Sequence, residues 1–273
     1  MSKIKTILKE VLLNLPFIWV FARYQKKSSF DGHKFGALWE YLNPLIQFAT
    51  WGFVFSVIRG RGAVEIAEGI YVPFIAWMLV GMTAWRFMNG AAKKGGDSVR
   101  RKTKSFSKLQ FPLSLLPAIV MASNLSSYLV LLLLTIVVLL ISGLTPNIQW
   151  LSFLYYFISM LIFTYTLGLF LSTIIARFRD FQNLTKPIWR MLFFFSGPIW
   201  RIQEMMPLWF ARLMDLTPFS YIITGMRYTF FGAGFFREDW LITTTAFWLV
   251  VLSLAISGSH MHLQFRDTLI EKV

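Results

Sequence analysis

The sequence predicts an all-α membrane protein with six transmembrane helices, an N-terminal amphipathic interface helix, and re-entrant helices between spans five and six. Hydrophobic residues make up 56 % of the 273 positions and charged residues only 15 %, against about 25 % in soluble domains. Long apolar runs fill most of the chain, and lysines and arginines gather between alternate runs. These observations exclude an ordinary soluble domain, and the lack of cysteine excludes disulfides and thiolate chemistry.

Residues 1–34 are expected to form the amphipathic interface segment. Six apolar residues recur with a helical period and form one stripe, with the lysines off it: Ile4, Ile7, Leu8, Val11, Leu12 and Leu15. A helix of this kind lies in the plane of the membrane surface. A cleaved leader is the alternative, but Asn14 and Pro16 interrupt its apolar run and no A-x-A cleavage site is present.

Residues 35–273 are expected to form a single six-span permease domain. A helix needs about 20 apolar residues to cross a bilayer, and the runs that we assign as spans are 41–58, 70–91, 113–142, 150–176, 187–201 and 240–260. Seven lysines and arginines precede the first span, and eight lie from the last turn of span two, at Arg86, to the start of span three. Because short basic loops stay in the cytoplasm, we expect a multi-pass protein of the cytoplasmic membrane with both termini cytoplasmic.

The net charge of +14 follows from this topology and from contact with anionic membrane lipid. No nucleic-acid partner is expected, because no basic domain lies outside the membrane flanks. A membrane-embedded transferase would need paired carboxylates or histidine clusters, yet acidic residues are sparse. His260 and His262 have no carboxylate nearby until Asp267, so their role stays open and no metal site or catalytic residue is expected.

The stretch 177–230 is apolar, but prolines and glycines cut it into pieces too short to cross a bilayer singly. Backbone groups freed by such breaks must be satisfied inside protein or in a wet cavity. We therefore expect a re-entrant region over about 202–234, an element that usually lines a translocation path. A kinked span followed by a surface loop is the alternative.

The order of these breaks resembles the permease subunits of type-2 ABC exporters that move polysaccharides. That family carries an R-D pair after span four, an S-P break in span five and a P-x-x-Y…R pattern before span six. The re-entrant and motif residues here are Arg179, Asp180, Ser196, Pro198, Pro207, Pro218, Tyr221 and Arg227. A glycine between Ser196 and Pro198 departs from the usual spacing. Residues 35–45 also look like the family's approach to span one, and the wall teichoic acid permeases are the most similar subfamily.

The resemblance implies the permease subunit of an ATP-driven exporter that translocates lipid-linked teichoic acid. Export of O-antigen or capsule is the alternative, and a membrane transferase or a passive channel fits less well. No G-x-x-x-x-G-K-[ST] phosphate loop is present, so this chain is expected to be no enzyme and to bind no cofactor. The implied partners are two ATPase subunits that use ATP and Mg, a second copy of this permease, and an undecaprenyl-diphosphate-linked polymer.

A basic loop follows the second predicted span. We expect Gly95-Gly96 to end that span and a short helix to follow over about 98–111. By resemblance this is the coupling helix that docks on the ATPase, and its residues are Arg100, Arg101, Lys104, Phe106, Lys108, Leu109 and Phe111. A loop that only follows the positive-inside rule would explain the charges but not Phe106 and Phe111.

Two further sets of residues are candidates for substrate contact. Aromatic faces stack on sugar rings without an exact register, so we assign a substrate path to Trp39, Tyr41, Trp51, Phe55, Trp85, Phe87, Trp189, Phe193, Phe194, Phe195 and Trp200. Basic residues at the interface are candidates to capture the lipid diphosphate: Arg23, Lys26, Lys27, Lys34, Arg177 and Arg179. Contact with lipid headgroups explains this second set equally well.

Overall fold

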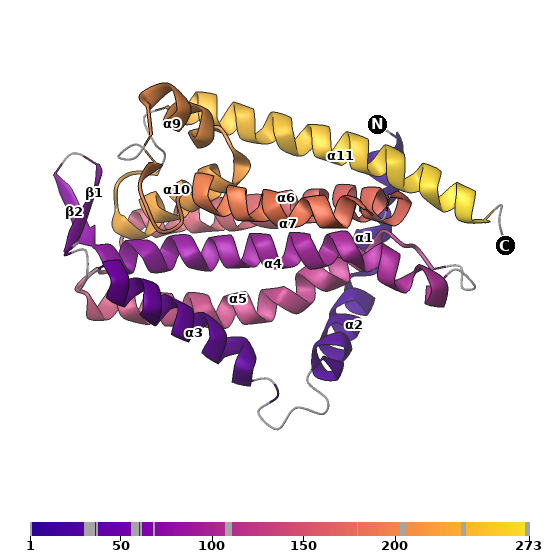
Figure 1. The fold of residues 1–273 in the computed structure, drawn as a ribbon, viewed down its shortest axis with the longest axis horizontal. Coiled ribbons are helices and arrows are strands. Elements are labelled where there is room, and N and C mark those ends of the chain that lie inside the picture. Colours follow the sequence, from indigo (N-terminus) through magenta and orange to yellow (C-terminus); the bar gives the residue numbers. More distant parts are fainter. Residues whose placement is uncertain are drawn as a thin grey trace.

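The computed structural model describes residues 2–29, 36, 38–55, 60, 62–67, 69–106, 111–178, 180–202, 206–235 and 239–270. Helices run back and forth along the long axis, and both chain ends lie at one end of the bundle (Figure 1). The elements are α1 Ser2–Leu13, α2 Leu15–Ser28, α3 Leu38–Phe53, β1 Ala63–Ala67, β2 Ile70–Pro73, α4 Phe74–Phe106, α5 Leu115–Ile141, the 3-10 helix η2 Ile148–Leu151, α6 Ser152–Arg177, α7 Phe181–Phe195, α9 Leu208–Asp215, α10 Pro218–Phe231 and α11 Trp240–Ile270.

Helix α4 is the centre of the bundle and packs against α5, α6 and α10. It runs unbroken for 33 residues, so the expectation that Gly95-Gly96 would end the span is wrong. The reason is packing: a Cβ on Gly95 would lie 3.6 Å from the Cα of Gly168 and 3.9 Å from the Cα of Pro117. These glycines allow close approach of helices instead of ending one.

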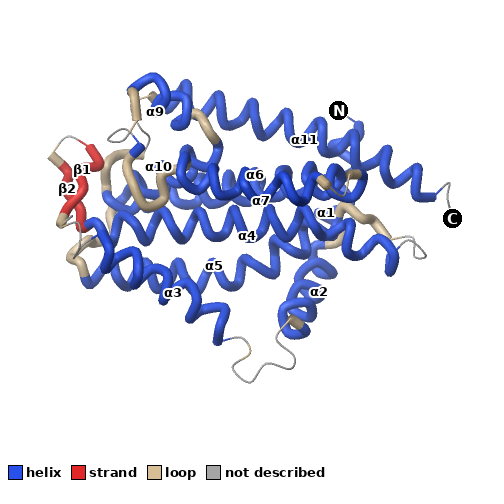
Figure 2. The backbone as a smooth tube through the Cα atoms, viewed as in Figure 1, coloured by secondary structure: helices blue, strands red, loops and turns tan. Residues whose placement is uncertain are grey.

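A two-stranded antiparallel hairpin stands at the end opposite to the termini, and Figure 2 shows its strands in red. The sequence analysis missed it and assigned residues 70–73 to span two. The strands pair Val64 with Val72 and Glu65 with Tyr71, and Gly69 in the turn has a φ of 75°. β-Branched and aromatic residues on both sides of a glycine were the overlooked signal. Helix α4 therefore begins at Phe74, directly after Pro73.

Three helical stretches are long and apolar enough to cross a membrane within the described residues: Leu115–Ile141, Ile148–Arg177 and Trp240–Arg266. Only 22 % of the most apolar stretch of α5 and of α11 is buried inside the protein, and many of their leucines and isoleucines face outward. Helices α3 and α7 are short at 16 and 15 residues and contain Pro44 and Pro187. The six-span count therefore stays a prediction, whereas a multi-pass helical membrane architecture is supported.

The N-terminal segment forms two helices, α1 and α2, which meet at Asn14. The predicted apolar stripe of α1 is divided between two environments. Ile7 is buried against Leu169 and Leu263, whereas Leu8 and Leu12 are each 54 % exposed. A helix that lies at the membrane surface keeps apolar side chains available to lipid. Leu8 and Leu12 are available in this way, while Ile7 attaches the helix to the bundle.

Helix breaks occur where prolines and glycines predict them. Helix α7 ends at Phe195, just before Ser196. Pro207 precedes the first residue of α9, and Pro218 begins α10, where the hydroxyl of Thr217 accepts a hydrogen bond from the Ser220 amide. The short helix α10 then lies inside the bundle against α4, α6 and α11. Its membrane re-entrant character stays a prediction.

Candidate functional site

Arg227 lies at the point where the family motifs meet. Its side chain projects from α10 and is 5 % exposed. Nη1 donates to the carbonyl of Gly197 at 2.9 Å, Nη2 donates to the carbonyl of Pro198 at 2.8 Å, and Nε donates to the carbonyl of Trp77 at 3.2 Å. One guanidinium thus binds α10 to the break after α7 and to the first turn of α4.

The surroundings of Arg227 fit this planar group closely. The guanidinium carbon lies 3.4 Å from the ring centroid of Trp77, a cation–π geometry. On α4, a Cβ on Gly81 would lie 2.2 Å from Nη2 and 2.8 Å from the Pro198 carbonyl oxygen, so only glycine fits there. We call Arg227, Trp77, Gly81, Gly197 and Pro198 the Arg227 clamp. Trp77 and Gly81 were not singled out by the sequence, because nothing local marks them as partners of a residue far along the chain.

Two contacts with α6 fix the register of α10. A Cβ on Gly225 would lie 2.0 Å from Cε1 of Tyr156, so this glycine admits a tyrosine of α6 against the α10 backbone. The hydroxyls of Ser152 and Thr229 lie 2.6 Å apart. Because these contacts lie on both sides of Arg227 in the sequence of α10, they hold this part of the helix in place and present Arg227 to its carbonyl acceptors.

Tyr221, another motif residue, joins α10 to α6 and α11 through hydroxyl groups. Its hydroxyl lies 3.0 Å from that of Tyr155 and 2.9 Å from that of Thr244, and Trp248 donates to the Tyr155 hydroxyl at 3.1 Å. Asp180 is exposed at the start of α7 and makes no side-chain cap hydrogen bond. Its neighbour Arg179 lies outside the described residues.

The predicted path aromatics divide into separate groups. The largest group joins α4 to α7: Trp85 contacts Phe193 and Phe219, Trp189 contacts Phe219, and Trp200 stacks on Phe194. Trp51 and Phe55 form a second series with Phe74. Phe87 packs on Tyr128 of α5, and Phe195 packs on Phe210 of α9.

Burial divides the same residues further. Phe55, Trp85, Phe87 and Trp189 are each less than 8 % exposed and belong to the hydrophobic core. Trp39 and Phe194 are 45 % and 46 % exposed. In this conformation the buried rings are therefore packing residues, and the exposed rings are the better placed for contact with a polymer. Whether any of them contacts substrate stays a prediction.

Of the predicted diphosphate-capture residues, Lys26 is already engaged. Its ammonium pairs with Glu40 at 3.2 Å and donates to Ser126 at 2.6 Å, so it joins α2, α3 and α5. Arg23 and Lys27 are exposed on α2, and Arg177 is exposed at the end of α6. Lys34 lies outside the described residues. The exposed cations, rather than Lys26, remain the candidates for a diphosphate.

The predicted coupling residues lie at the termini end of α4 and beyond it. Arg101 pairs with Asp97 at 3.3 Å, and Asp97 also accepts from Gln182 of α7. Arg100 is half-buried. Phe111 packs against Phe17 of α2 instead of projecting freely. Lys104 and Phe106 fall in the last turn of α4, where only the backbone is described, and Lys108 and Leu109 lie outside the described residues.

No group of three or more histidine, aspartate or glutamate residues in the described chain is placed to hold a metal ion. The ammonium of Lys3 on α1 donates to Nδ1 of His260 at 3.1 Å, and His262 is buried beside Thr173 of α6. Both histidines therefore contribute to contacts of α11 with its neighbours.

The comparisons with known proteins agree with the fold and the motifs. An ABC-2 type transporter profile matches residues 17–231. O-antigen export system permease proteins RfbA from Klebsiella pneumoniae and Myxococcus xanthus are each 24 % identical to this chain. The first alignment covers 84 % of this chain and 86 % of the relative, and the second covers 85 % and 86 %. The profile match extends from within α2 to the end of α10, so the chain belongs to the ABC-2 type transporter family of membrane transporter subunits.

Proposed function

We propose that this chain is the permease subunit of an ATP-driven exporter of lipid-linked polysaccharide, of the O-antigen class. The observation that carries the proposal is the family match over 17–231 together with relatives that are named O-antigen export permeases and align over most of both chains. The chain itself has no phosphate loop. A separate nucleotide-binding subunit must therefore hydrolyse the ATP and bind its Mg.

The assembly that fits this function contains two permeases and two ATPases in the cytoplasmic membrane. A single bundle cannot enclose a path for a polymer, so a second copy is needed. Exposed apolar side chains on α3, among them Leu45, Ile46 and Phe53, are available to that copy or to lipid. Both termini and the basic end of α4 lie at one end of the bundle (Figure 1), which favours that end as the cytoplasmic, ATPase-facing side.

The choice between O-antigen and teichoic acid rests on the comparisons. The motif pattern alone favoured a teichoic acid exporter, whereas the relatives named above, at 23–24 % identity, are O-antigen export permeases. At this distance the shared property is a lipid-diphosphate-linked sugar polymer. Teichoic acid adds a phosphate at each repeat, so a path that suits it must tolerate many negative charges.

The test is ATPase activity of the permease reconstituted with its ATPase subunit in proteoliposomes. The additions compared are an undecaprenyl-diphosphate-linked O-antigen, a lipid-linked teichoic acid precursor, and undecaprenyl diphosphate alone. We expect the O-antigen to stimulate hydrolysis most. The negative control is an ATPase subunit whose phosphate-loop lysine is replaced, so that it cannot hydrolyse ATP.

Stimulation by the teichoic acid precursor alone would return the assignment to that polymer. Failure of the permease to form a complex with its ATPase subunit would overturn the exporter proposal. A Phe106→Ala variant is expected to insert and assemble normally while stimulation is lost. Phe178→Ala, which changes an exposed phenylalanine at the same end of the bundle, is the matched control and is expected to behave as the parent.

A further inference from the structure

A polar cavity of about 210 Å³ lies beside the Arg227 clamp, at the hairpin end of the bundle. Five segments line it: β1, the first turn of α4 at Trp77, the chain that follows α7, the end of α9, and one side of α10. A buried water needs only about 10–15 Å³ of such space. The cavity therefore has room for a molecule much larger than a single water.

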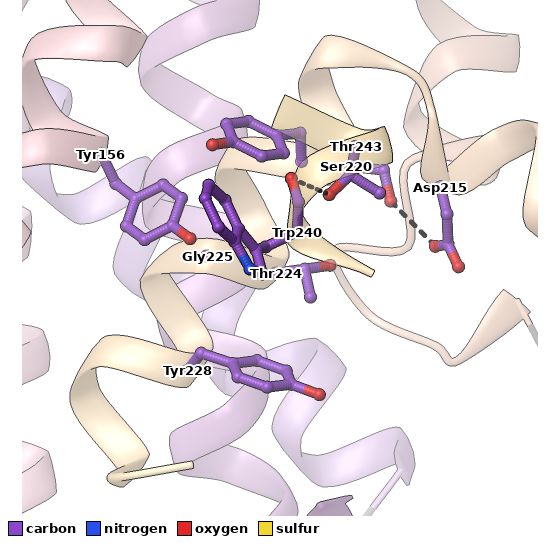
Figure 3. Close-up of a pocket in the computed structure, with 9 residues that line it drawn as sticks. Tyr156, Asp215, Ser220, Thr224, Gly225, Tyr228, Trp240 and Thr243 are labelled. Carbon is purple, nitrogen blue, oxygen red and sulfur yellow. Dashed lines mark hydrogen bonds between the residues drawn. The ribbon is translucent and has the colours of Figure 1, made fainter. Parts of the chain in front are cut away.

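Helix α10 turns its only accessible side toward this cavity. From Phe219 to Phe231 every residue is buried except Thr224 and Tyr228, and both line the cavity. Thr224 and Tyr228 also line a smaller neighbouring pocket, which Figure 3 shows together with Asp215, the acceptor of a hydrogen bond from Ser220. Because Thr224 and Tyr228 are four positions apart on a helix, their hydroxyl groups lie on the same wall of the cavity.

The charges around the cavity select the class of ligand. Carboxylates of Glu65 and Asp215 and guanidinium groups of Arg201 and Arg227 all line it. A phosphate would meet the carboxylates, and a cation would meet the guanidinium groups. A neutral ligand that carries both donors and acceptors, such as a polyhydroxylated ring, matches this mixture.

An aromatic surface completes the match. The indole of Trp200 lines the cavity and is held by stacking on Phe194, with ring centroids 4.9 Å apart and planes at 9°. Its Nε1 donates to the Phe194 carbonyl at 2.7 Å, which fixes the ring. A rigid aromatic group beside hydroxyls and carboxylates suits a pyranose, which has one apolar face and a polar edge.

We propose that this cavity binds one neutral sugar residue of the exported polymer. The ring stacks on Trp200, and its hydroxyls pair with the carboxylates of Glu65 and Asp215. The proposal rests on the proposed function, because it takes the polymer to be a polysaccharide. It adds a saccharide site within one protomer, at the hairpin end, formed by the chain around the α7 break and by α10.

The test is saturation-transfer NMR on the full-length permease in nanodiscs. The probes are the methyl pyranosides of glucose, galactose, mannose and rhamnose. We expect at least one to bind the wild type. Binding should be about five-fold weaker to Trp200→Ala, which loses the stacking surface, and not detectable with Thr224→Phe, which fills the cavity. The matched controls are Trp209→Ala, an exposed tryptophan of α9, and Thr245→Phe, an exposed position on α11; both are expected to bind as the wild type.

Absence of a signal with the wild type for every glycoside would overturn the proposal and leave a solvent-filled cavity. Equal binding to Trp200→Ala and to the wild type would also overturn it, even if Thr224→Phe fails to fold. Neither result would affect the proposed function, which is decided by ATPase stimulation with the lipid-linked polymer. Conversely, glycoside binding that follows this pattern without ATPase stimulation would retain the site and reject the exporter assignment.

Discussion

The two ends of the bundle are held together by different kinds of polar contact. At the hairpin end, the buried guanidinium of Arg227 bonds three backbone carbonyls. At the termini end, side chains pair with side chains across helices, as in Glu10–Arg266 between α1 and α11, Lys26–Glu40 between α2 and α3, and Lys102–Gln25 between α4 and α2. The hairpin end is thus held by one buried guanidinium, and the termini end by several partly exposed side-chain pairs.

This difference predicts different responses to mutation and to salt. Backbone carbonyls at a helix break have no helical partner, so removing Arg227 leaves them unpaired inside the protein. The ion pairs at the termini end are partly solvated, with side-chain exposures of 32 % for Arg266 and 20 % for Glu10, and such pairs are weak and screened by salt. We therefore expect the hairpin end to contribute more to stability and the termini end to shift more readily.

The largest effect is expected from Arg227→Ala. It removes three hydrogen bonds and opens space beside Trp77, so we expect a loss on the order of 3–5 kcal/mol in unfolding free energy. Arg227→Lys should lose about half as much, because an ammonium cannot reproduce the planar fork. Denaturant unfolding of the solubilised protein measures both. Arg212→Ala, which removes an exposed arginine of α9 at the same end, is the control, and an equal midpoint for both alanine variants would refute the clamp.

Two glycines of α4 should respond to alanine with opposite signs. Gly81→Ala forces a Cβ to within 2.2 Å of Arg227 Nη2, and we expect destabilisation of about 2–3 kcal/mol. At Gly90 the nearest atom would be 3.6 Å away, so Gly90→Ala should be neutral or stabilise by up to about 1 kcal/mol. The same unfolding assay compares them. In the double variant with Arg227→Ala, the loss of unfolding free energy caused by Gly81→Ala should be smaller than in the wild type. If the two losses simply add, Gly81 and Arg227 do not share a contact.

A smaller effect is expected at the termini end. A double-mutant cycle with Glu10→Gln and Arg266→Gln should give a coupling of about 0.5–1 kcal/mol. Thermal unfolding at low and high NaCl concentration measures it, and the coupling should decrease in high salt. A coupling as large as the effect of Arg227→Ala, or one that salt leaves unchanged, would remove the distinction between the two ends.

The smallest effect on stability is expected for Arg101→Ala. The Arg101 side chain is 68 % exposed and pairs with Asp97 one helical turn earlier, a contact worth about 0.3–0.5 kcal/mol. If Arg101 contacts the ATPase, polymer-stimulated hydrolysis should fall several-fold while the unfolding midpoint barely changes. Unchanged stimulation would exclude Arg101 from coupling, and Lys9→Ala, which removes an exposed cation of α1, is the charge-matched control.

Local patterns in the sequence predicted several elements correctly. The helical period of residues 4–15 predicted an amphipathic helix, and prolines at 207 and 218 marked the starts of α9 and α10. These features depend on neighbours within one or two turns, so the chain carries them locally. The family motifs likewise identified Arg227, although not the partners that it bonds.

The same local rules failed where a distant contact decided the outcome. Gly95-Gly96 reads as a stop signal, yet α4 continues because α5 and α6 require a surface without side chains there. Residues 70–73 are apolar like the span that follows, yet they pair with β1. Aromatic residues such as Trp85 and Trp189 were expected to face a path, but burial places them in the core.

The sequence by itself determined the membrane class, the helical character of most segments and the positions of the breaks, because hydropathy and backbone preference are properties of short stretches. Only the tertiary structure decided which distant residues contact the chain at these helix breaks. It brought Arg227 to the carbonyls of Gly197 and Pro198 and placed Trp200 on the wall of a cavity. Those arrangements join residues about 30 to 150 positions apart, and no short-range pattern encodes which distant carbonyl a buried guanidinium will satisfy.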